Sequence, residues 1–425
     1  MTTSLVTTIT GARLPRWLLP RDWPQRDGAP ALATIEIEGG VIGAVRSDRQ
    51  SGPDRRLPSG ASIDLQGALV LPALVEAHAH LDKAYTRGRL GALAPGLLPA
   101  IAAMHEDRAN WTDDDLLQRA NRALEAAWSA GVTHLRTHVD WWDAGAPRAW
   151  QLFGELAQTW RTRMRLERVA LVPLPLFQSA AAARSIASQI AASDDAVLGA
   201  FIHTSNYARA SLDHLIDAAA TASLALDLHV DEELDAHACG LAHVAARAAQ
   251  CTATGGLRRI VCSHACALAA QDDDAAFALL DRMARVPLAL IALPATNLLL
   301  QDARAGRTPR LRGLSLLHEA RARGIPVLVG SDNVQDAFCP LGTFDPVDAL
   351  RTGILAAQLD DPFDKWTDTI CRADWLGDAP DSQPTLVGRR ADLVVFDTAE
   401  VHTWPSLTAR RVLRASTDTI LRITI

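Results

Sequence analysis

Two histidines spaced one residue apart are the strongest local sign of chemistry in this sequence. His78 and His80 come directly after Leu69–Val75, an apolar stretch of strand length. Alternate residues of an extended segment point the same way, so both imidazoles should project together from the end of this strand. Because neutral imidazole is a common ligand of Zn and Fe in proteins, the pair indicates a metal site. The alternative is a pair of polar loop residues that bind no metal.

Three further polar groups also follow apolar stretches of strand length. His229 closes one stretch, and Glu232, three residues later, adds a carboxyl group that could transfer a proton. His264 and Asp332 follow two later stretches, the second within a Ser-Asp-Asn turn. Taken alone, each group has a simpler interpretation: an acidic turn, a core histidine or an ordinary turn.

The elements that must position these groups alternate between apolar, strand-length stretches and Ala-rich, helix-length stretches. Near-continuous apolar strands are typical of a parallel sheet that is covered on both faces. Eight such strands with helices between them predict an α/β fold, a closed (β/α)8 TIM-like barrel, with an open doubly wound sheet as the alternative. The expected strands are Ala68–Val75, Thr133–Val139, Leu166–Val172, Val197–Ile202, Ala225–Val230, Arg259–Val261, Val286–Leu293 and Ile325–Val329. The expected helices include Thr112–Ala130, Ala181–Ala192, Ser211–Ala222, Ala236–Ala249 and Leu314–Arg323.

In such a barrel the polar groups belong to strands one, five, six and eight. The carboxyl ends of all barrel strands form one rim, and barrel active sites lie at that rim. Four unrelated explanations would have to coincide for these groups to have no common role. The order of the groups along the chain therefore predicts one shared metal site.

Both ends of the chain are rich in β-strand patterns. The segment 33–45 reads as a hairpin, and strands are expected at 388–397, 410–415 and 419–425. The Pro-, Gly- and Arg-rich segment Ser51–Ser59 reads as a linker. We therefore expect residues 1–64 and 380–425 to form a composite β-sandwich beside a barrel of residues 65–379.

Several segments together resemble the amidohydrolase superfamily, in particular its cytosine deaminase-like branch. The resemblance covers nearly the whole chain. The segments that carry it are Leu71–Asp82, Arg136–Asp140, His229–Glu232, Ser263-His264, Gly330–Asn333, Pro340–Gly342 and Gly388–Val394.

This resemblance implies one Zn or Fe ion and a set of site residues. The metal ligands would be His78, His80, His229 and Asp332, and the catalytic groups would be Glu232, His264 and Asp332. Members of this superfamily that bind two metal ions resemble one another in having a carbamylated lysine near the fourth strand, which bridges the metals. The two lysines of this chain, Lys83 and Lys365, lie elsewhere, so a single metal ion is expected. Three further polar residues would support the ligands or form a buried network: Asp82, His138 and Asp140.

The implied reaction is the hydrolytic deamination of a cyclic amidine, such as a cytosine-like pyrimidine or a related heterocycle. A metal with an open position lowers the pKa of a bound water to about 7, which provides a hydroxide to attack the ring carbon. Asp332 would accept the water proton and later pass it to the departing amine. His264 would orient the hydroxide, and Glu232 would protonate the adjacent ring nitrogen.

Two departures from the cytosine deaminase pattern concern the substrate. Residues 169–177 contain no amide side chain, whereas the cytosine deaminases resemble one another in having a glutamine in this region. Asn333 stands where those enzymes have a second aspartate. The pocket should therefore be more apolar than that of the cytosine deaminases, and it should select less strongly for a substrate with a free amino group. We expect Asn333, His203 and Leu81 to contact the substrate. The alternatives are an N-alkyl aminotriazine amidohydrolase, similar to the N-isopropylammelide enzymes, and a non-catalytic scaffold with the same fold.

Composition narrows the class of protein. The 425 residues are 48% hydrophobic and 21% charged, which excludes a disordered chain, and the net charge of −7 disfavours a nucleic-acid partner. No signal peptide or membrane span is evident. We expect a cytoplasmic protein with six reduced cysteines that binds a small heterocyclic molecule, and the sequence leaves a homo-oligomer open.

Overall fold

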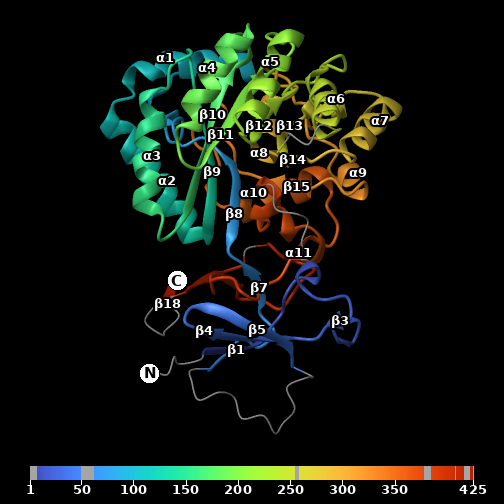
Figure 1. The fold of residues 1–425 in the computed structure, drawn as a ribbon. Helices are drawn as coiled ribbons and strands as arrows, with labels where there is room; N and C mark the ends of the chain where they lie inside the picture. The colour runs from blue at the N-terminus through green and yellow to red at the C-terminus, as the bar shows by residue number, and fades with distance from the viewer. Residues whose placement is uncertain are drawn as a thin grey trace.

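The computed structural model describes residues 7–48, 62–253, 258–377, 384–406, 408–415 and 422–424. Figure 1 shows a barrel of parallel strands surrounded by helices, with smaller sheets beside it that contain strands from both ends of the chain. The linker expected at Ser51–Ser59 lies outside the described residues. None of the described helices is both long enough and apolar enough to cross a bilayer.

Eight parallel strands form the barrel, and they pair in the order in which they occur along the chain. A bridge between Ala79 and Asp332 joins the last strand region to the first. The expected (β/α)8 barrel is therefore confirmed. The strands are β8 (Leu74–Ala79), β9 (Val132–Asp140), β10 (Arg165–Pro173), β11 (Ala196–Ile202), β12 (Leu226–Val230), β13 (Ile260–His264), β14 (Leu288–Ala292) and β15 (Val327–Val329).

Helices surround the barrel (Figure 1). Most of them bury apolar side chains in the same hydrophobic cluster as the barrel strands. The α-helices are α1 (Leu97–Asp107), α2 (Asp113–Ala130), α3 (Arg148–Trp160), α4 (Ala180–Ala191), α5 (Arg209–Thr221), α6 (Gly240–Ala253), α7 (Asp273–Met283), α8 (Pro294–Leu300), α9 (Leu317–Ala322), α10 (Pro346–Ala357) and α11 (Pro362–Lys365). Short 3-10 helices lie at η1 (Arg16–Leu18), η2 (Arg87–Arg89), η3 (Arg108–Asn110), η4 (Leu174–Phe177), η5 (Cys266–Ala269), η6 (Thr367–Ile370) and η7 (Ala373–Leu376).

Two four-stranded sheets lie beside the barrel: one contains N-terminal strands alone, and the other joins Leu69–Pro72 to C-terminal strands. Buried side chains of both sheets form one hydrophobic cluster, as expected for packed sheets. The other face of the second sheet contributes Leu69, Leu71, Val394 and Phe396 to the main cluster of the barrel. The first sheet contains β5 (Val41–Ser47), β4 (Ala33–Glu38), β1 (Thr7–Ala12) and β6 (Ser62–Asp64) in that order. The second contains β18 (Arg422–Thr424), β17 (Arg410–Arg414), β16 (Leu393–Phe396) and β7 (Leu69–Pro72), and β2 (Gln25–Arg26) pairs with β3 (Ala29–Pro30). The domain limits at residues 64 and 380 stay a prediction, and residue 380 lies outside the described residues.

The single strand expected over 68–75 is two strands in the structure. β7 pairs antiparallel with β16 of the small sheet, whereas β8 pairs with β9 in the barrel. Ala73 lies between them, and its N–H donates to the carbonyl of Asp392 at 2.9 Å. An apolar sequence pattern cannot reveal this change of partner, because both strands are buried. As a result His78 lies within β8, and His80 directly follows it.

Replacing Gly131 by Ala should destabilise the fold by about 2 to 4 kcal/mol. Gly131 ends α2 with a φ of +109°, and an added Cβ would lie 2.5 Å from Cγ2 of Val394 in β16. The substitution therefore combines backbone strain with overpacking at the contact between barrel and small sheet. Urea denaturation of the wild type and the variant measures the change. Gly88→Ala is the control, because its added Cβ would meet nothing within 4 Å; an equal loss of stability in both variants would contradict the argument.

Candidate active site

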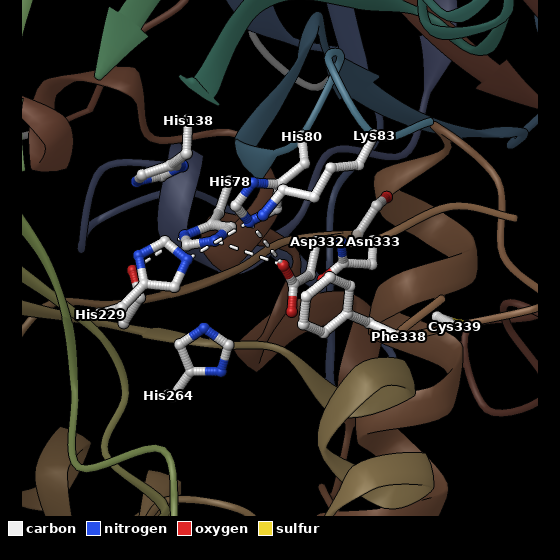
Figure 2. Close-up of polar contacts among 12 residues, drawn as sticks. His78, His80, Lys83, His138, His229, His264, Asp332, Asn333, Phe338 and Cys339 are labelled. Atoms are coloured by element: carbon white, nitrogen blue, oxygen red, sulfur yellow. Dashed lines mark hydrogen bonds and ion pairs between the residues drawn. The ribbon is translucent and has the colours of Figure 1, made fainter. Parts of the chain in front are cut away.

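Three imidazoles and one carboxylate meet at the carboxyl end of the barrel strands (Figure 2). The side chains of His78, His80, His229 and Asp332 each offer a ligand atom within 4.8 Å of the others, and all four are buried. Nε2 of His80 lies 3.3 Å from Nε2 of His229 and 3.1 Å from Oδ1 of Asp332. Nε2 of His78 lies 3.4 Å from the same oxygen. The structure thus brings together the four side chains that the sequence singled out as ligands.

The barrel strands fix where these four side chains point. His78 belongs to β8 and His229 to β12, while Asp332 lies just after β15. The N–H of Asp332 donates to the carbonyl of His78 at 2.8 Å, so the chain after β15 is tied to β8. Asp332 adopts a φ of +60°, which is uncommon for a residue other than glycine. Such strained backbone is frequent where a fold holds a functional side chain in place.

The donor atoms of this cluster fit a metal ion. Five of its buried nitrogen and oxygen atoms accept no hydrogen bond from the residues that the structure describes: Nε2 of His78, Nδ1 of His80, Nδ1 of His229 and both carboxylate oxygens of Asp332. Burial lowers the pKa of His80 and His229 well below the ordinary value, so both rings are neutral and can serve as ligands. Unsatisfied buried polar atoms are costly, and a divalent cation would satisfy Nε2 of His78 and an oxygen of Asp332. Nε2 of His80 and Nε2 of His229 lie beside these atoms and would be the ligand atoms of their rings.

The outer nitrogen of His78 is held by a buried chain of polar groups. Its Nδ1 lies 2.9 Å from the hydroxyl of Ser263, and that hydroxyl lies 3.4 Å from Oδ1 of Asp227. Arg136 donates to the other oxygen of Asp227 at 2.8 Å. A proton on Nδ1 of His78 would leave Nε2 free to bind a metal, which is the usual arrangement around metal-bound histidines. His138, expected as a supporting residue, stacks on His78 with 3.9 Å between the ring centroids.

Glu232 and His264 lie beside the cluster. Nδ1 of His264 is 3.3 Å from Oε1 of Glu232 and 3.1 Å from the amide nitrogen of Asn297. Burial and the nearby carboxylate of Asp332 raise the pKa of Glu232 well above its ordinary value. Burial lowers the pKa of His264 to about 3. A protonated carboxyl and a neutral imidazole therefore face the same space, and they could donate and accept protons there.

A cavity opens in front of these groups, and its wall is mainly apolar and aromatic. Leu171 and Pro173 of β10 supply the apolar surface that the sequence predicted for the third strand. Sequence reasoning missed the aromatic residues and α1, because no local pattern connects them with the barrel rim. The complete lining is His80, Lys83, Leu97, Ile101, Met104, Asp140, Trp141, Trp142, Leu171, Pro173, Phe201, His229, Glu232, His264, Asp332, Asn333 and Phe338.

The three expected substrate contacts lie in different places. Asn333 lines the cavity, and its amide nitrogen donates to Oδ2 of Asp336 at 2.6 Å. His203 lines an outer cavity that shares Leu97 and Glu232 with the inner one, and its Nε2 lies 3.3 Å from Oε2 of Glu233. Leu81 is fully buried and does not belong to the lining of the inner cavity. Substrate contact by these residues stays a prediction, and the geometry favours Asn333.

Comparisons with known proteins agree with this geometry. The sequence profile of the amidohydrolase family matches residues 84–416. A pterin deaminase of Rhizobium rhizogenes is 35% identical over 352 residues, which is 80% of this chain and 79% of that protein. 

Two solved structures share the fold over nearly the full length of both chains. One is 5-methylcytosine deaminase from Klebsiella pneumoniae bound to 5-fluorocytosine, with a TM-score of 0.77, 24% identity and 96% of each chain covered. The other is N-isopropylammelide isopropylaminohydrolase from Burkholderia multivorans, with a TM-score of 0.71, 23% identity and 98% of each chain covered. At this level of identity the two similarities show the fold alone.

Proposed function

The chain belongs to the amidohydrolase family, and on this premise we propose that it is a metal-dependent hydrolase that removes an amino group, as ammonia, from a ring carbon of a pterin-like or pyrimidine heterocycle. The observation that carries the proposal is the cluster of three imidazoles and one carboxylate beside the buried carboxyl group of Glu232. In both candidate rings the reacting carbon carries an amino group next to a ring nitrogen, as in every cyclic amidine. The pterin deaminase relative favours the larger, two-ring substrate.

His78, His80, His229 and Asp332 would hold the metal ion. When it is bound, a divalent cation in such a site supplies Lewis acidity and lowers the pKa of water. Zn and Fe both suit this donor set, so the proposal includes either metal, in a single site. Both oxygens of Asp332 lack hydrogen bonds within the described part of the chain. One oxygen can therefore bind the metal while the other accepts the proton of the attacking water and passes it to the departing amine.

Glu232 and His264 would complete the proton transfers. The protonated carboxyl of Glu232 can donate to the ring nitrogen beside the attacked carbon, so that no free nitrogen anion forms. The neutral ring of His264 is held between Glu232 and Asn297, and it can orient the attacking oxygen. The aromatic and apolar wall accepts a flat ring and excludes water from it.

The apolar wall also supports a second candidate. Leu97, Ile101 and Met104 of α1 face the cavity and could contact an N-alkyl group. Hydrolysis of an N-alkyl aminotriazine would use the same catalytic groups and release an alkylamine in place of ammonia. The identity of the released amine distinguishes the two candidates.

We propose a small-molecule substrate and a reducing compartment, which the cytoplasm provides. The chain has six cysteines. Four of them are buried and have no disulfide partner among the described residues, as is usual for proteins in a reducing environment.

A screen of amine release by metal-quantified protein tests the proposal. We expect ammonia from at least one of pterin, isocytosine and cytosine, and no ammonia after the metal has been removed with a chelator. Re-addition of Zn or Fe should restore the activity, because removal leaves the protein side chains unchanged. Release of isopropylamine from N-isopropylammelide would favour the second candidate. No amine from any of these compounds, with metal bound, would contradict both.

A further inference from the structure

Lys83 is a buried cation in the wall of the proposed active site. It follows the metal-ligand segment of β8 by a few residues, its exposed fraction is 4%, and it lines the same cavity as Glu232 and Asp332. Its side chain extends toward His80 and Asp332 (Figure 2). None of the catalytic steps described above uses this residue.

The ammonium group of Lys83 has donors to spare. Nζ pairs with Oδ1 of Asp140 at 2.9 Å, and it lies 5.0 Å from the centre of the Phe338 ring. Among the described residues, no second acceptor lies within hydrogen-bonding distance of Nζ. An ammonium group carries three N–H donors and no acceptor, so two donors remain for a ligand. The ion pair with Asp140 keeps the group charged in spite of its burial.

A second donor in the same wall also lacks an acceptor. Trp141 lines the cavity and is 1% exposed. Its indole N–H is buried and makes no hydrogen bond to the residues that the structure describes. Buried donors are normally paired, so two underused donors in one cavity indicate a ligand that carries acceptors.

The composition of the chain makes the choice of residue informative. Of its 42 basic residues, only Lys83 and Lys365 are lysines, and the others are arginines. Lys365 is exposed and pairs with Asp360 at the surface. Lys83 is therefore a lysine within the described lining of the cavity, which contains no arginine, in a protein whose basic residues are nearly all arginines. A compact ammonium suits a single acceptor atom, whereas the planar guanidinium suits two.

We propose that Lys83 is a specificity-determining residue that donates a hydrogen bond to a carbonyl oxygen on the substrate ring. This inference rests on the proposed function and narrows it to heterocycles that carry an oxo group near the amino group that is lost, as in 2-amino-4-oxo rings. An oxo oxygen accepts a hydrogen bond from the ammonium, whereas an amino group at the same place presents its own N–H bonds to Lys83. A site with a fixed hydrogen-bond donor discriminates against a ring that has no acceptor at the matching position.

Two pairs of compounds that differ only at this group test the proposal. The pairs are pterin with 2,4-diaminopteridine, and isocytosine with 2,4-diaminopyrimidine. We expect Lys83→Met to lower kcat/KM for the oxo member about 10- to 100-fold, and to change kcat/KM for the diamino member less than about threefold. The ratio within one preparation does not depend on the fraction of folded or metal-loaded protein. Lys365→Met is the matched control and should leave both values unchanged.

The outcomes separate the inference from the proposed function. An equal loss on both members of a pair would assign Lys83 a structural role and overturn the inference, as would an unchanged value for the oxo member. If Lys83→Met folds poorly because Asp140 is left unpaired, Lys83→Met/Asp140→Asn removes both charges, and the same ratio is measured. A metal-loaded wild type that releases ammonia from none of the four compounds overturns the inference. The deaminase proposal is overturned with it only if cytosine also yields no ammonia.

Discussion

Glu232→Gln is expected to lower kcat about a thousandfold while the protein keeps its bound metal. Glutamine has nearly the same shape as glutamate, so the cavity and the four metal-binding side chains should stay in place. It cannot supply the acidic proton that the carboxyl of Glu232 would donate to the ring nitrogen. Burial and the carboxylate of Asp332 raise the pKa of Glu232, which favours its protonated form, whereas the amide of glutamine has no acidic proton. Steady-state kinetics and metal analysis on the same preparation measure the two effects.

Glu233→Gln is the matched control for this variant. Glu233 is the next residue in the chain, but its carboxylate accepts a hydrogen bond from the N–H of Thr204 at 2.7 Å and pairs with His203 in the outer cavity. Its substitution should leave kcat nearly unchanged. If the Glu232 variant kept more than about a tenth of the wild-type kcat, general acid catalysis by this residue would be wrong.

The positions of the polar groups along the chain were sufficient to predict the architecture and the cluster. The apolar stretches that precede His229, His264 and Asp332 correspond to β12, β13 and β15, which the closed barrel brings to one rim. This inference succeeds because a parallel barrel places all strand ends of one kind together. The residues on those ends are therefore neighbours even though more than 100 positions separate His229 from Asp332.

The wall of the cavity could not be predicted in the same way. Trp142 and Phe201 follow or end strands, whereas Phe338 and α1 come from long connections whose paths depend on tertiary packing. Loop residues have no periodicity that relates them to the barrel axis. His203 shows what position alone leaves open: it follows β11 at the same rim, and its ring turns to Glu233 in the outer cavity, so its contact with the substrate stays a prediction. The position of a residue on the rim predicts that it lies near the site. Its hydrogen-bond and ion-pair partners determine whether its side chain faces the site.

The sequence contains a signal for Lys83, namely the scarcity of lysine in the chain, but the interpretation used it only for the positions that lack a lysine. The scarcity of lysine argued against a lysine-bridged pair of metals. The same scarcity marks Lys83, three positions after His80, as unusual. The structure adds what composition cannot, namely that its ammonium lies in the cavity wall beside Asp140.

His229→Asn is expected to reduce the metal content from about one equivalent to below about one tenth, and to abolish ammonia release. Of the four side chains in the cluster, His229 is the one that β12 supplies, and its Nε2 lies 3.3 Å from Nε2 of His80. Two neutral imidazole nitrogens at that distance cannot both carry a proton, so a cation between the side chains removes an otherwise unfavourable contact. Asparagine is shorter and lacks a nitrogen that could reach the same point. Elemental analysis after dialysis against a weak chelator measures the content.

A thermal measurement without substrate separates metal binding from catalysis. A ligand that binds only the folded state stabilises it by about 4 kcal/mol at a thousand times its Kd, so added Zn or Fe should raise the Tm of the apo wild type by several degrees. The Tm of His229→Asn should not respond. His243→Asn is the matched control, since His243 is a buried histidine that pairs with Asp213 at 3.0 Å, away from the cluster. A full equivalent of metal and an intact Tm response in His229→Asn would exclude His229 as a ligand, because the metal would then be held by other side chains.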